Sequence, residues 1–334
     1  MAKSVQSKAR NINIMFTCVG RRVSLLKSFR KAAGDLKIKS SITGTDTTEL
    51  SPALQLCDKK FIVKPVTHRD YLKEILHIVK KNKVGLLIPT VDLDLKLLAK
   101  NKARFEELGC RVLISTPQVI DICQDKRKTH RFLAKNGFDT PVTVSVNSIR
   151  SKHTIKYPCF LKPWDGYASR GAAMVKNRNE LAFFSRRIPN CIVQQYIEGV
   201  EHTCDVFVDF SGSVRCVVPR KRIEVRTGEV SKGQIVKNAK MMRKTAEVVE
   251  ALGAGPGVIT VQLILTKKGE IKFTEINPRF GGGAPLAIKA GADFPKWILQ
   301  QLIDKKPRIK FDGFKDGLVM LRYDGEVWLN SDKK

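Results

Sequence analysis

Apolar runs alternate with amphipathic stretches of helical period along the first third of the chain. The runs that read as strands lie at 12–18, 41–45, 60–63, 85–89 and 111–115. The stretches with apolar residues at helical spacing lie at 23–33, 71–82 and 95–108. Strands that alternate with helices predict a largely parallel sheet with helices on its faces. We therefore expect a doubly wound α/β domain over 1–115.

The pattern changes after about residue 115. A helix is expected over 126–136, and from 141 onward the strands are longer and more often adjacent, with turns at 210–213 and 267–270. Adjacent strands joined by tight turns are typical of antiparallel sheets. This part is therefore predicted to be α+β, in two subdomains over 116–196 and 197–334.

The charge balance favours anionic ligands. The 334 residues include 61 Lys and Arg against 32 Asp and Glu, a formal net charge of +29. Such a chain attracts nucleic acid, acidic membranes, nucleotides or phosphorylated substrates. Because the basic residues are spread at helical spacing rather than run together, a solvated basic surface accounts for most of the excess. Nucleic acid is not a favoured partner, although the charge does not exclude it.

The cysteines and the hydropathy indicate a cytoplasmic protein. The eight Cys form no Cys-x-x-Cys pair and lie mostly in apolar runs, which is typical of reduced, buried cysteines. The N-terminus is polar, without the apolar stretch of a signal peptide, and the chain has no apolar run of about 18 residues. We expect no association with a membrane.

Three oxygen-bearing side chains are expected to meet near the C-terminal end. Glu275 and Asn277 are two residues apart on one strand, so their side chains share a face. Gln262 lies on the preceding strand of the same hairpin and can face the same point. Amide and carboxylate oxygens suit Mg²⁺ or Mn²⁺, with substrate phosphates completing the shell. A polar exposed sheet face is the alternative, although the neighbours Ile264 and Phe273 are apolar.

A lysine followed by a loop of small residues forms a second candidate site. Lys162 ends an apolar strand, and Gly166 and Gly171 enclose a loop that contains Ala168 and Ser169. Backbone amides of such a loop can line phosphates, and the lysine can supply a point charge. An ordinary turn between two strands is the alternative.

A third stretch fits the nucleoside of a nucleotide. An apolar strand leads into Gln195 and Ile197, the chain turns at Glu198-Gly199, and Glu201 opens a new strand. Adenine needs an apolar slot with backbone donors and acceptors, and a carboxylate just beyond can accept hydrogen bonds from both ribose hydroxyls. The alternative is a strand, a turn and a strand with a surface glutamate.

A dinucleotide site is not expected. The first strand leads into Val19-Gly20-Arg21-Arg22, which has one glycine where a Gly-x-Gly-x-x-Gly fingerprint would have three. Two arginines are also bulky where a pyrophosphate must approach the backbone closely.

The ordered set of motifs resembles the ATP-grasp superfamily. The set comprises the Lys162 strand with its loop, QQYIEGVE, Gln262 and Glu275-Ile276-Asn277-Pro278-Arg279. It is similar to the branch of the carbamoyl-phosphate synthase large subunit, whose metal ligands are likewise Gln, Glu and Asn. FTCVGRR and TGTDTTELSPALQLCD resemble the lobe that precedes the ATP-grasp domain in this superfamily. The resemblance implies a pre-ATP-grasp domain (1–115), a central lid subdomain (116–196) and a C-terminal metal- and substrate-binding subdomain (197–334).

The resemblance implies a role for each matching position. The implied ATP-binding positions are Lys126, Lys162, Gly166, Gly171, Gln195, Ile197 and Glu201. The implied metal ligands are Gln262, Glu275 and Asn277. Lys162 and Arg279 are implied to be catalytic, because they would neutralise charge on the transferring phosphoryl group.

Two further stretches are candidates for substrate binding. Gly282 lies in a glycine run before an expected helix, which is either an anion site or a flexible turn. Arg222, Arg226 and Glu229 belong to a strand that alternates Arg and Glu. They either read a charged substrate or form a salt-bridged exposed strand, and both interpretations stay open.

The implied activity is that of an ATP- and magnesium-dependent, ADP-forming carboxylate–amine ligase. It would phosphorylate a small carboxylate to an acyl phosphate, which an amine or ammonia captures. Two alternatives remain: a basic nucleic-acid-binding protein with a decayed nucleotide site, and a carbamoyl-phosphate-forming enzyme. The second is disfavoured because the chain lacks the duplicated half of the full synthase. The substrates and the oligomeric state stay open, with a homodimer among the options.

Overall fold

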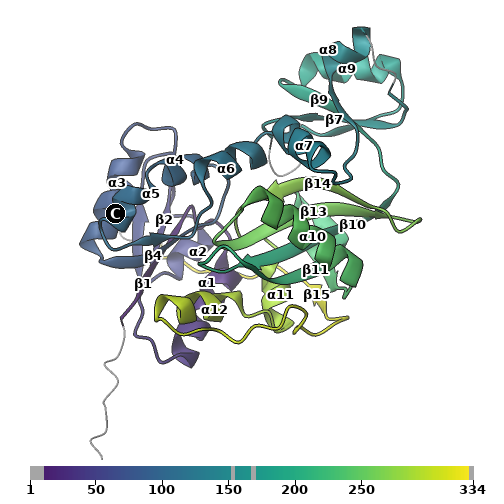
Figure 1. Ribbon diagram of the computed structural model, residues 1–334. Helices are drawn as coiled ribbons and strands as arrows, with labels where there is room; N and C mark the ends of the chain where they lie inside the picture. The colour runs from purple at the N-terminus through teal and green to yellow at the C-terminus, as the bar shows by residue number, and fades with distance from the viewer. Residues whose placement is uncertain (1–10, 152–154, 167–170, 331–334) are drawn as a thin grey trace, which may run out of the picture. The chain divides into compact units, whose positions relative to one another are not determined.

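The computed structural model describes residues 11–151, 155–166 and 171–330. The chain divides into two compact units (Figure 1). Unit 1 comprises Met1–Ile114, Asp293–Arg308 and Asp324–Lys334, and unit 2 comprises Ser115–Ala292 and Ile309–Tyr323. The division into 1–115, 116–196 and 197–334 stays a prediction.

Unit 1 is built on a five-stranded sheet in the order β3-β2-β1-β4-β5, in which all neighbours pair parallel. Its strands are β1 (Asn13–Thr17), β2 (Ile42–Asp46), β3 (Lys59–Ile62), β4 (Val84–Pro89) and β5 (Arg111–Val112). Its helices are α1 (Val23–Asp35), α2 (Pro52–Gln55), α3 (Tyr71–Lys81), α4 (Leu95–Lys100), α5 (Lys102–Glu106) and α12 (Phe294–Leu302). The predicted doubly wound arrangement is confirmed.

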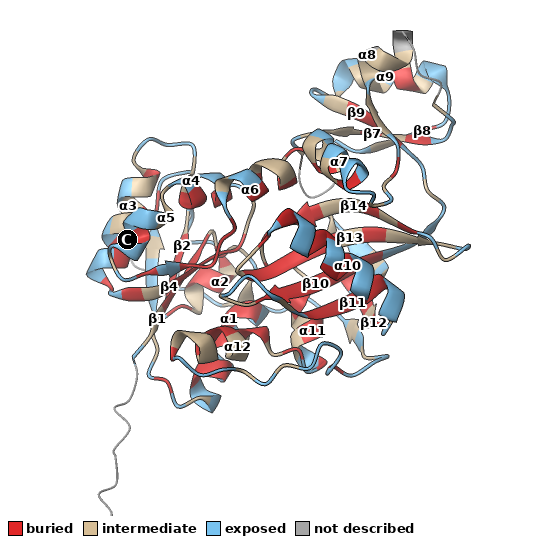
Figure 2. Cartoon of the chain, in the orientation of Figure 1, coloured by how far each residue is buried: buried red, intermediate tan, exposed pale blue. Residues whose placement is uncertain are grey.

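The central strands of unit 1 are buried on both faces. Ile14, Met15 and Phe16 are fully buried on β1, because a parallel sheet has helices on each side and its inner strands read as continuous apolar runs (Figure 2). Helix α12 packs against α1 although the two lie at opposite ends of the chain. Unit 1 is therefore completed by a segment that sequence spacing would assign to the C-terminal subdomain.

A buried carboxylate lies beside the carboxyl ends of β1 and β4. Asp94 is fully buried, and its Oδ2 accepts a hydrogen bond from the Tyr71 hydroxyl at 3.2 Å. The Cys18 Sγ lies 3.9 Å from the same oxygen. Burial raises the pKa of the Asp94 carboxyl to about 6, since the charged form loses its hydration.

Unit 2 contains two antiparallel sheets. The four-stranded sheet has the order β6-β9-β7-β8 and the six-stranded sheet the order β14-β13-β10-β11-β12-β15. The smaller sheet consists of β6 (Thr143–Ser145), β7 (Cys159–Pro163), β8 (Ala173–Val175) and β9 (Cys191–Gln195), with the helices α8 (Val146–Ser151) and α9 (Arg178–Arg187). The larger consists of β10 (Gly199–Val208), β11 (Val214–Arg226), β12 (Glu229–Ile235), β13 (Gly257–Thr266), β14 (Ile271–Asn277) and β15 (Val319–Leu321). The remaining helices are α6 (Pro117–Cys123), α7 (Lys126–Lys135), α10 (Ala239–Leu252) and α11 (Ala284–Lys289).

Each sheet of unit 2 has its own apolar core. In the smaller sheet, Cys159, Leu161 and Val193 pack with Leu181 of α9. In the larger sheet, α10 packs on β10 and β11 and buries its apolar side against them. All eight cysteines are free thiols, and most are buried. In the described part of the chain, no helix is both long and apolar enough to cross a membrane.

We predict that Asp94→Asn stabilises unit 1 at neutral pH. The carboxyl ionises near pH 4 in the unfolded chain and near pH 6 in the folded one. The free energy of unfolding therefore falls by about 3 kcal/mol as the pH rises through this window. Asparagine keeps an acceptor for Tyr71 and does not titrate. Thermal unfolding from pH 4 to pH 8 should give a midpoint for Asp94→Asn that exceeds the wild-type midpoint increasingly up to about pH 6. An equal difference at pH 4 and pH 8 would contradict the pKa shift.

Candidate active site

One face of the six-stranded sheet carries polar side chains. The Thr245 hydroxyl of α10 donates a hydrogen bond to the Cys204 Sγ at 3.5 Å, so Cys204 of β10 faces that helix. Successive side chains of a strand point to opposite faces. Glu201, Thr203 and Asp205 therefore lie on the other face, away from α10.

The pairing of β13 with β14 adds three predicted metal ligands to this face. Gln262 lies directly opposite Thr203 of β10 and Glu275 of β14. Thr260 lies opposite Asn277, one step further along. Directly opposed residues have their β-carbons about 4.5–5.5 Å apart on the same side of the sheet. Gln262, Glu275 and Asn277 thus share the polar face.

A cavity of about 360 Å³ lies between the two sheets of unit 2. Eight predicted ATP- or metal-binding residues line it: Lys126, Lys162, Gly166, Gln195, Ile197, Glu201, Gln262 and Glu275. Asn277 is 8% exposed and lies deeper on the same face. The loop residues 167–170, which include Ala168 and Ser169, lie outside the described residues, and Gly171 packs against Pro163.

Lys162 reaches the cavity from β7 with a side chain held in place. Its Nζ donates to Gln194 Oε1 at 2.8 Å, and Gln194 Nε2 donates to Thr143 Oγ1 at 2.9 Å. Burial lowers the pKa of Lys162 to about 8; Glu275 opposes this effect and Lys126 adds to it. An anion in the cavity would compensate the lost hydration and favour the charged amine.

The start of α7 ties Lys126 to the glycine loop. Its Nζ donates to the Gly166 carbonyl, and its backbone N–H donates to the Trp164 carbonyl at 3.0 Å. The neighbouring Arg127 pairs instead with Asp125, at 2.7 Å between Nη2 and Oδ2, and its guanidinium lies 3.8 Å from the Trp164 ring centroid. Lys126 is therefore the residue at this junction that lines the cavity.

The predicted adenine edge is anchored to β6. The Gln195 backbone N–H donates to the Val142 carbonyl at 2.8 Å, and its side-chain Oε1 accepts from the Val142 N–H at 3.3 Å. These bonds fix the end of β9. Ile197 then passes along the cavity wall.

Arg222 lines the cavity, although Ile223 and Arg226 further along the strand are exposed. Its Nη1 donates to Gln262 Oε1 at 3.1 Å and lies 3.5 Å from Glu201 Oε2. By contrast, the Arg226 side chain is 69% exposed and lies 3.8 Å from Glu224. The β11–β12 ladder shifts register on both sides of Glu224, which breaks the simple alternation of this strand. Arg222 and Arg226 therefore occupy different environments.

Arg322 makes two contacts in this region that no sequence motif predicts. Its Nη1 lies 3.3 Å from Glu229 Oε2, and its Nη2 donates to the Gly282 carbonyl. It follows the short edge strand β15, in a stretch without any motif. Glu229 and Gly282 are thus joined by a common partner rather than open to solvent separately.

The glycines around Gly282 are required by close packing. Arg220 is buried and forms two hydrogen bonds with the buried Asp205, at 2.6 and 2.9 Å. A β-carbon on Gly283 would lie 2.1 Å from Arg220 Nη1, and one on Gly281 would lie 2.9 Å from Thr260 Oγ1. Steric contact with the sheet accounts for glycine at 281 and 283, and a role of Gly282 in substrate binding stays a prediction.

The last predicted catalytic residue, Arg279, follows β14 next to this glycine run. Its backbone carbonyl accepts from the Thr260 hydroxyl at 2.9 Å, and its Nη1 donates to the Phe280 carbonyl at 3.1 Å. The Thr260 contact fixes the chain directly after Asn277. Arg279 is half-buried and does not line the cavity as the structure stands.

Two family profiles match consecutive parts of the chain. The profile described as "PylC-like, N-terminal domain" matches residues 14–113, and the profile described as "ATP-grasp domain" matches residues 123–283. The chain contains an ATP-grasp domain. The resemblance to ligases like the carbamoyl-phosphate synthase large subunit is confirmed by curated relatives with that name.

The similarity of this ATP-grasp chain to its relatives is distant. The D-alanine–D-alanine ligase A of Bacillus cereus is 26% identical over 160 residues, which cover 42% of this chain and 53% of the ligase. The N-terminal section of the Methanopyrus kandleri carbamoyl phosphate synthase large chain is 23% identical over 241 residues, 65% of this chain and 43% of that section. The chain thus aligns with about half or less of the length of these relatives.

A solved structure shares the fold. The biotin carboxylase domain of Hydrogenobacter thermophilus 2-oxoglutarate carboxylase, in complex with MgADP, ADP and bicarbonate, superposes with a TM-score of 0.69. The match covers 92% of this chain and 73% of that chain at 18% sequence identity.

The donor set of the ATP-grasp cavity fits a magnesium ion that arrives with phosphate. Within residues 11–151, 155–166 and 171–330, no three His, Cys, Asp or Glu residues are placed to hold a metal ion by themselves. Gln262, Glu275 and Asn277 offer one carboxylate and two amide oxygens on one face. Mg²⁺ is commonly held by one or two carboxylates, with waters and substrate phosphates completing an octahedral shell.

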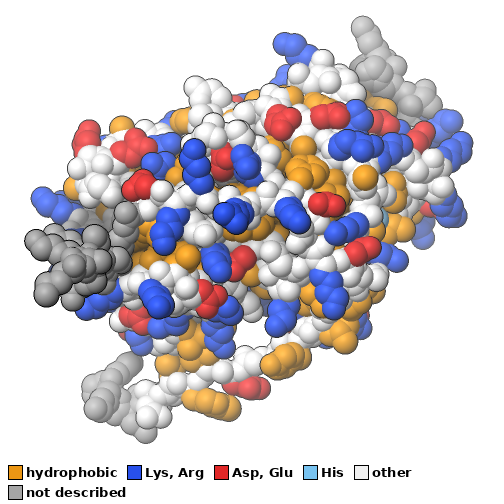
Figure 3. Space-filling view, turned by 60° about the horizontal axis from the view of Figure 1, so that its bottom comes forward, with side chains coloured by type: hydrophobic (Ala, Val, Ile, Leu, Met, Phe, Trp, Pro, Cys, Tyr) orange, Lys and Arg blue, Asp and Glu red, His pale blue; other side chains and the backbone are white. Residues whose placement is uncertain are grey.

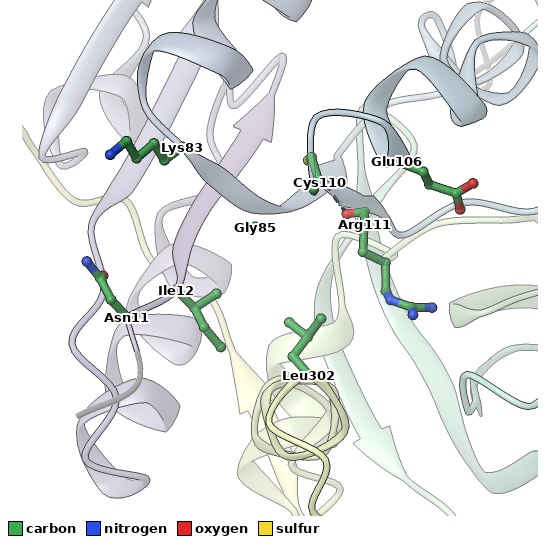
Figure 4. A pocket seen from close by; sticks show the side chains of 9 residues that line it. Asn11, Ile12, Lys83, Gly85, Glu106, Cys110, Arg111 and Leu302 are labelled. Atoms are coloured by element: carbon green, nitrogen blue, oxygen red, sulfur yellow. Dashed lines mark hydrogen bonds between the residues drawn. The ribbon is translucent and has the colours of Figure 1, made fainter. Parts of the chain in front are cut away.

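A larger hollow in unit 1 has no comparable chemistry. It measures about 450 Å³ and lies at the amino ends of β1 and β4, beside Leu302 of α12 (Figure 4). The charged ends of Lys83 and Arg111 point away from each other in this view. Ligands of open parallel sheets bind at the carboxyl ends of the strands, which is the opposite edge. We assign it no function.

We predict that Gly283→Ala destabilises unit 2 by about 1–3 kcal/mol, the usual cost of overpacking a dense interior. The new methyl group would force Arg220 away from Asp205, because it would overlap the buried guanidinium that is bonded to this carboxylate. Urea denaturation measures the change. Gly34→Ala is the matched control, since a β-carbon at Gly34 meets nothing within 4 Å. Equal stability of the two variants would disprove the packing argument.

Proposed function

We propose that this ATP-grasp protein is an ATP- and Mg²⁺-dependent, ADP-forming carboxylate–amine ligase. It phosphorylates a small carboxylate to an acyl phosphate, which an amine or ammonia then captures. The observation that carries the proposal is the pairing of Gln262 with Glu275 on a cavity wall that faces Lys162. An amide, a carboxylate and a lysine around one cavity suit a metal-bound triphosphate.

Each side chain has a distinct task in this proposal. Adenine lies beside Gln195 and Ile197, the ribose hydroxyls donate to Glu201, and Lys126 and Lys162 attract the phosphates. Gln262, Glu275 and Asn277 would hold Mg²⁺, which would supply positive charge beside the phosphates. Gly166 and Gly171 would lie near the phosphates.

The reaction then needs positioning more than acid–base chemistry. A carboxylate oxygen of the substrate attacks the γ-phosphorus in line, the bond from phosphorus to the bridging oxygen breaks, and ADP leaves. Lys162 and Arg279 neutralise the charge that develops during transfer. The amine attacks the acyl carbon of the acyl phosphate, and inorganic phosphate leaves as the amine loses a proton. Arg279 must turn toward the cavity for this role.

The relatives support binding of a nucleotide and a metal ion, but their names do not agree on one substrate. The similar biotin carboxylase domain was solved with MgADP and bicarbonate, whereas the similar curated ligase is named for D-alanine. We propose small-molecule carboxylate and amine substrates in general. Eight free, mostly buried cysteines favour a reducing compartment, so we place the enzyme in the cytoplasm.

The charge distribution on one face of the molecule does not favour the nucleic-acid alternative. On the face shown in Figure 3, Lys and Arg side chains are spread over the surface and interspersed with Asp and Glu. Nucleic-acid binders gather their basic residues on one face or along one helix. A carbamoyl-phosphate-forming reaction remains the second candidate, because curated carbamoyl phosphate synthases are among the relatives.

We predict that Glu275→Gln abolishes ADP formation while the protein stays folded. The substitution removes the single negative charge among the three proposed metal ligands. ADP release should first be screened over amino acids, small acids and bicarbonate, each with amines or ammonia, and the variant then tested in the active combination. Release with bicarbonate and ammonia alone would identify the carbamoyl-phosphate reaction. Unchanged turnover in Glu275→Gln would remove the metal assignment.

We predict that ADP affinity falls as the pH rises above about 8. In the protein without ligand, the pKa of Lys162 is about 8. A bound phosphate raises this pKa again, so ADP binding takes up a proton in this pH range. Calorimetry in two buffers with different ionisation enthalpies measures the uptake between pH 7 and pH 9.5. Lys162→Arg remains charged and should lose this dependence. Affinity that does not change with pH in the wild type would contradict the assignment.

A further inference from the structure

The Arg222 guanidinium joins two groups that the proposed function assigns to different parts of the nucleotide complex. Through Nη1 it donates to Gln262 Oε1, a proposed metal ligand, at 3.1 Å. The same nitrogen lies 3.5 Å from the carboxylate of Glu201, the proposed ribose acceptor. Through Nη2 it donates to the Gly228 carbonyl at 3.2 Å. One cation thus holds both polar groups in the free protein.

Arg222 is enclosed by the cavity wall. Its side chain is 9% exposed, and it lines the same cavity as Glu275 and Lys162. Its Nε is buried and has no hydrogen-bond partner among the residues that the structure describes. A buried donor without an acceptor costs free energy. The Arg222 side chain can therefore adopt a more favourable arrangement when a ligand fills the cavity.

A metal ion and Arg222 compete for one oxygen atom. Magnesium binds oxygen at about 2.1 Å. An ion on Gln262 Oε1 would therefore lie no more than about 5 Å from Arg222 Nη1. Two positive charges at this distance in a partly buried site repel each other strongly. Arg222 also neutralises Glu201, a carboxylate that would otherwise add to the attraction for a cation.

We propose that Arg222 stands in for the divalent cation in the free site and excludes metal until a nucleotide is bound. This inference rests on the proposed function, in which Gln262 and Glu275 are metal ligands. Ribose hydroxyls offer Glu201 another partner, and the phosphates supply negative charge that attracts the metal despite Arg222. The metal therefore enters with the nucleotide. Arg222 stays attached to the β11–β12 turn through Gly228.

Binding of Mn²⁺ to the full chain, measured by electron paramagnetic resonance without nucleotide, tests the proposal. Wild-type protein should bind Mn²⁺ weakly. Arg222→Met should bind one Mn²⁺ about tenfold more tightly or better, because loss of a like charge in contact with a site shifts its affinity by at least that factor. Arg222→Lys keeps the positive charge and should exclude Mn²⁺ as the wild type does. Adding Glu275→Gln to Arg222→Met should remove the new binding.

Arg215→Met is the matched control. Arg215 lies on the same strand, its side chain is 45% exposed, and it is 3.7 Å from Asp209 at the other end of β11. This variant should bind Mn²⁺ like the wild type. If Arg222→Met proves unstable in thermal unfolding, Arg222→Gln removes the same charge and its Mn²⁺ affinity decides.

The outcomes separate this inference from the proposed function. Wild-type protein with ADP should bind Mn²⁺ tightly; if it does not, the nucleotide and metal assignment itself fails. If ADP promotes Mn²⁺ binding but neutral variants at Arg222 bind free Mn²⁺ no better than the wild type, the role of Arg222 is overturned and the proposed function stands. Tight binding by Arg222→Lys would also overturn it, because charge would then not be the cause.

Discussion

A single extra residue in β14 decides which side chains meet in this protein. From the hairpin turn up to Leu263 opposite Phe273, β13 and β14 pair one residue against one. At the next step Gln262 lies opposite Glu275, so Thr274 is left over as a bulge. Without it, Gln262 would lie opposite Thr274, and Glu275 would point to the face covered by α10. The bulge thus places the carboxylate on the polar face, as bulges beside active sites often do.

The cavity beside this face is lined by more cationic than anionic side chains. Lys126, Lys162 and Arg222 line it, against the carboxylates of Glu201 and Glu275. Burial lowers the pKa of Lys162, because positive charge is poorly hydrated in the cavity wall. In the proposed function, a polyphosphate would supply the missing negative charge, and a metal ion would bind only together with it. The electrostatics of the free cavity and the metal requirement of the proposed reaction are therefore two aspects of one charge balance.

Local sequence patterns predict much of this structure, whereas the rest depends on contacts between distant segments. Period and turn chemistry predict the parallel sheet of unit 1, the hairpins and the polar residues of β13 and β14. They do not predict that α12 packs against α1, because that contact joins the two ends of the chain. Nor do they separate Arg222 from Arg226, since the difference comes from irregular pairing around Glu224. Arg322 had no local signal because its partners lie on distant segments.

The buried ion pair of Arg220 and Asp205 positions the segment that follows β14. Such a pair contributes little net stability, because removing two charges from water offsets their attraction. Its geometric effect is larger. Arg220 fills the space that side chains at 281 and 283 would need, so the chain after β14 can pack closely only with glycine at both positions. Thr260 fixes the start of this segment by its bond to the Arg279 carbonyl. The segment that carries Asn277 and Arg279 is therefore positioned by a buried ion pair that does not line the cavity.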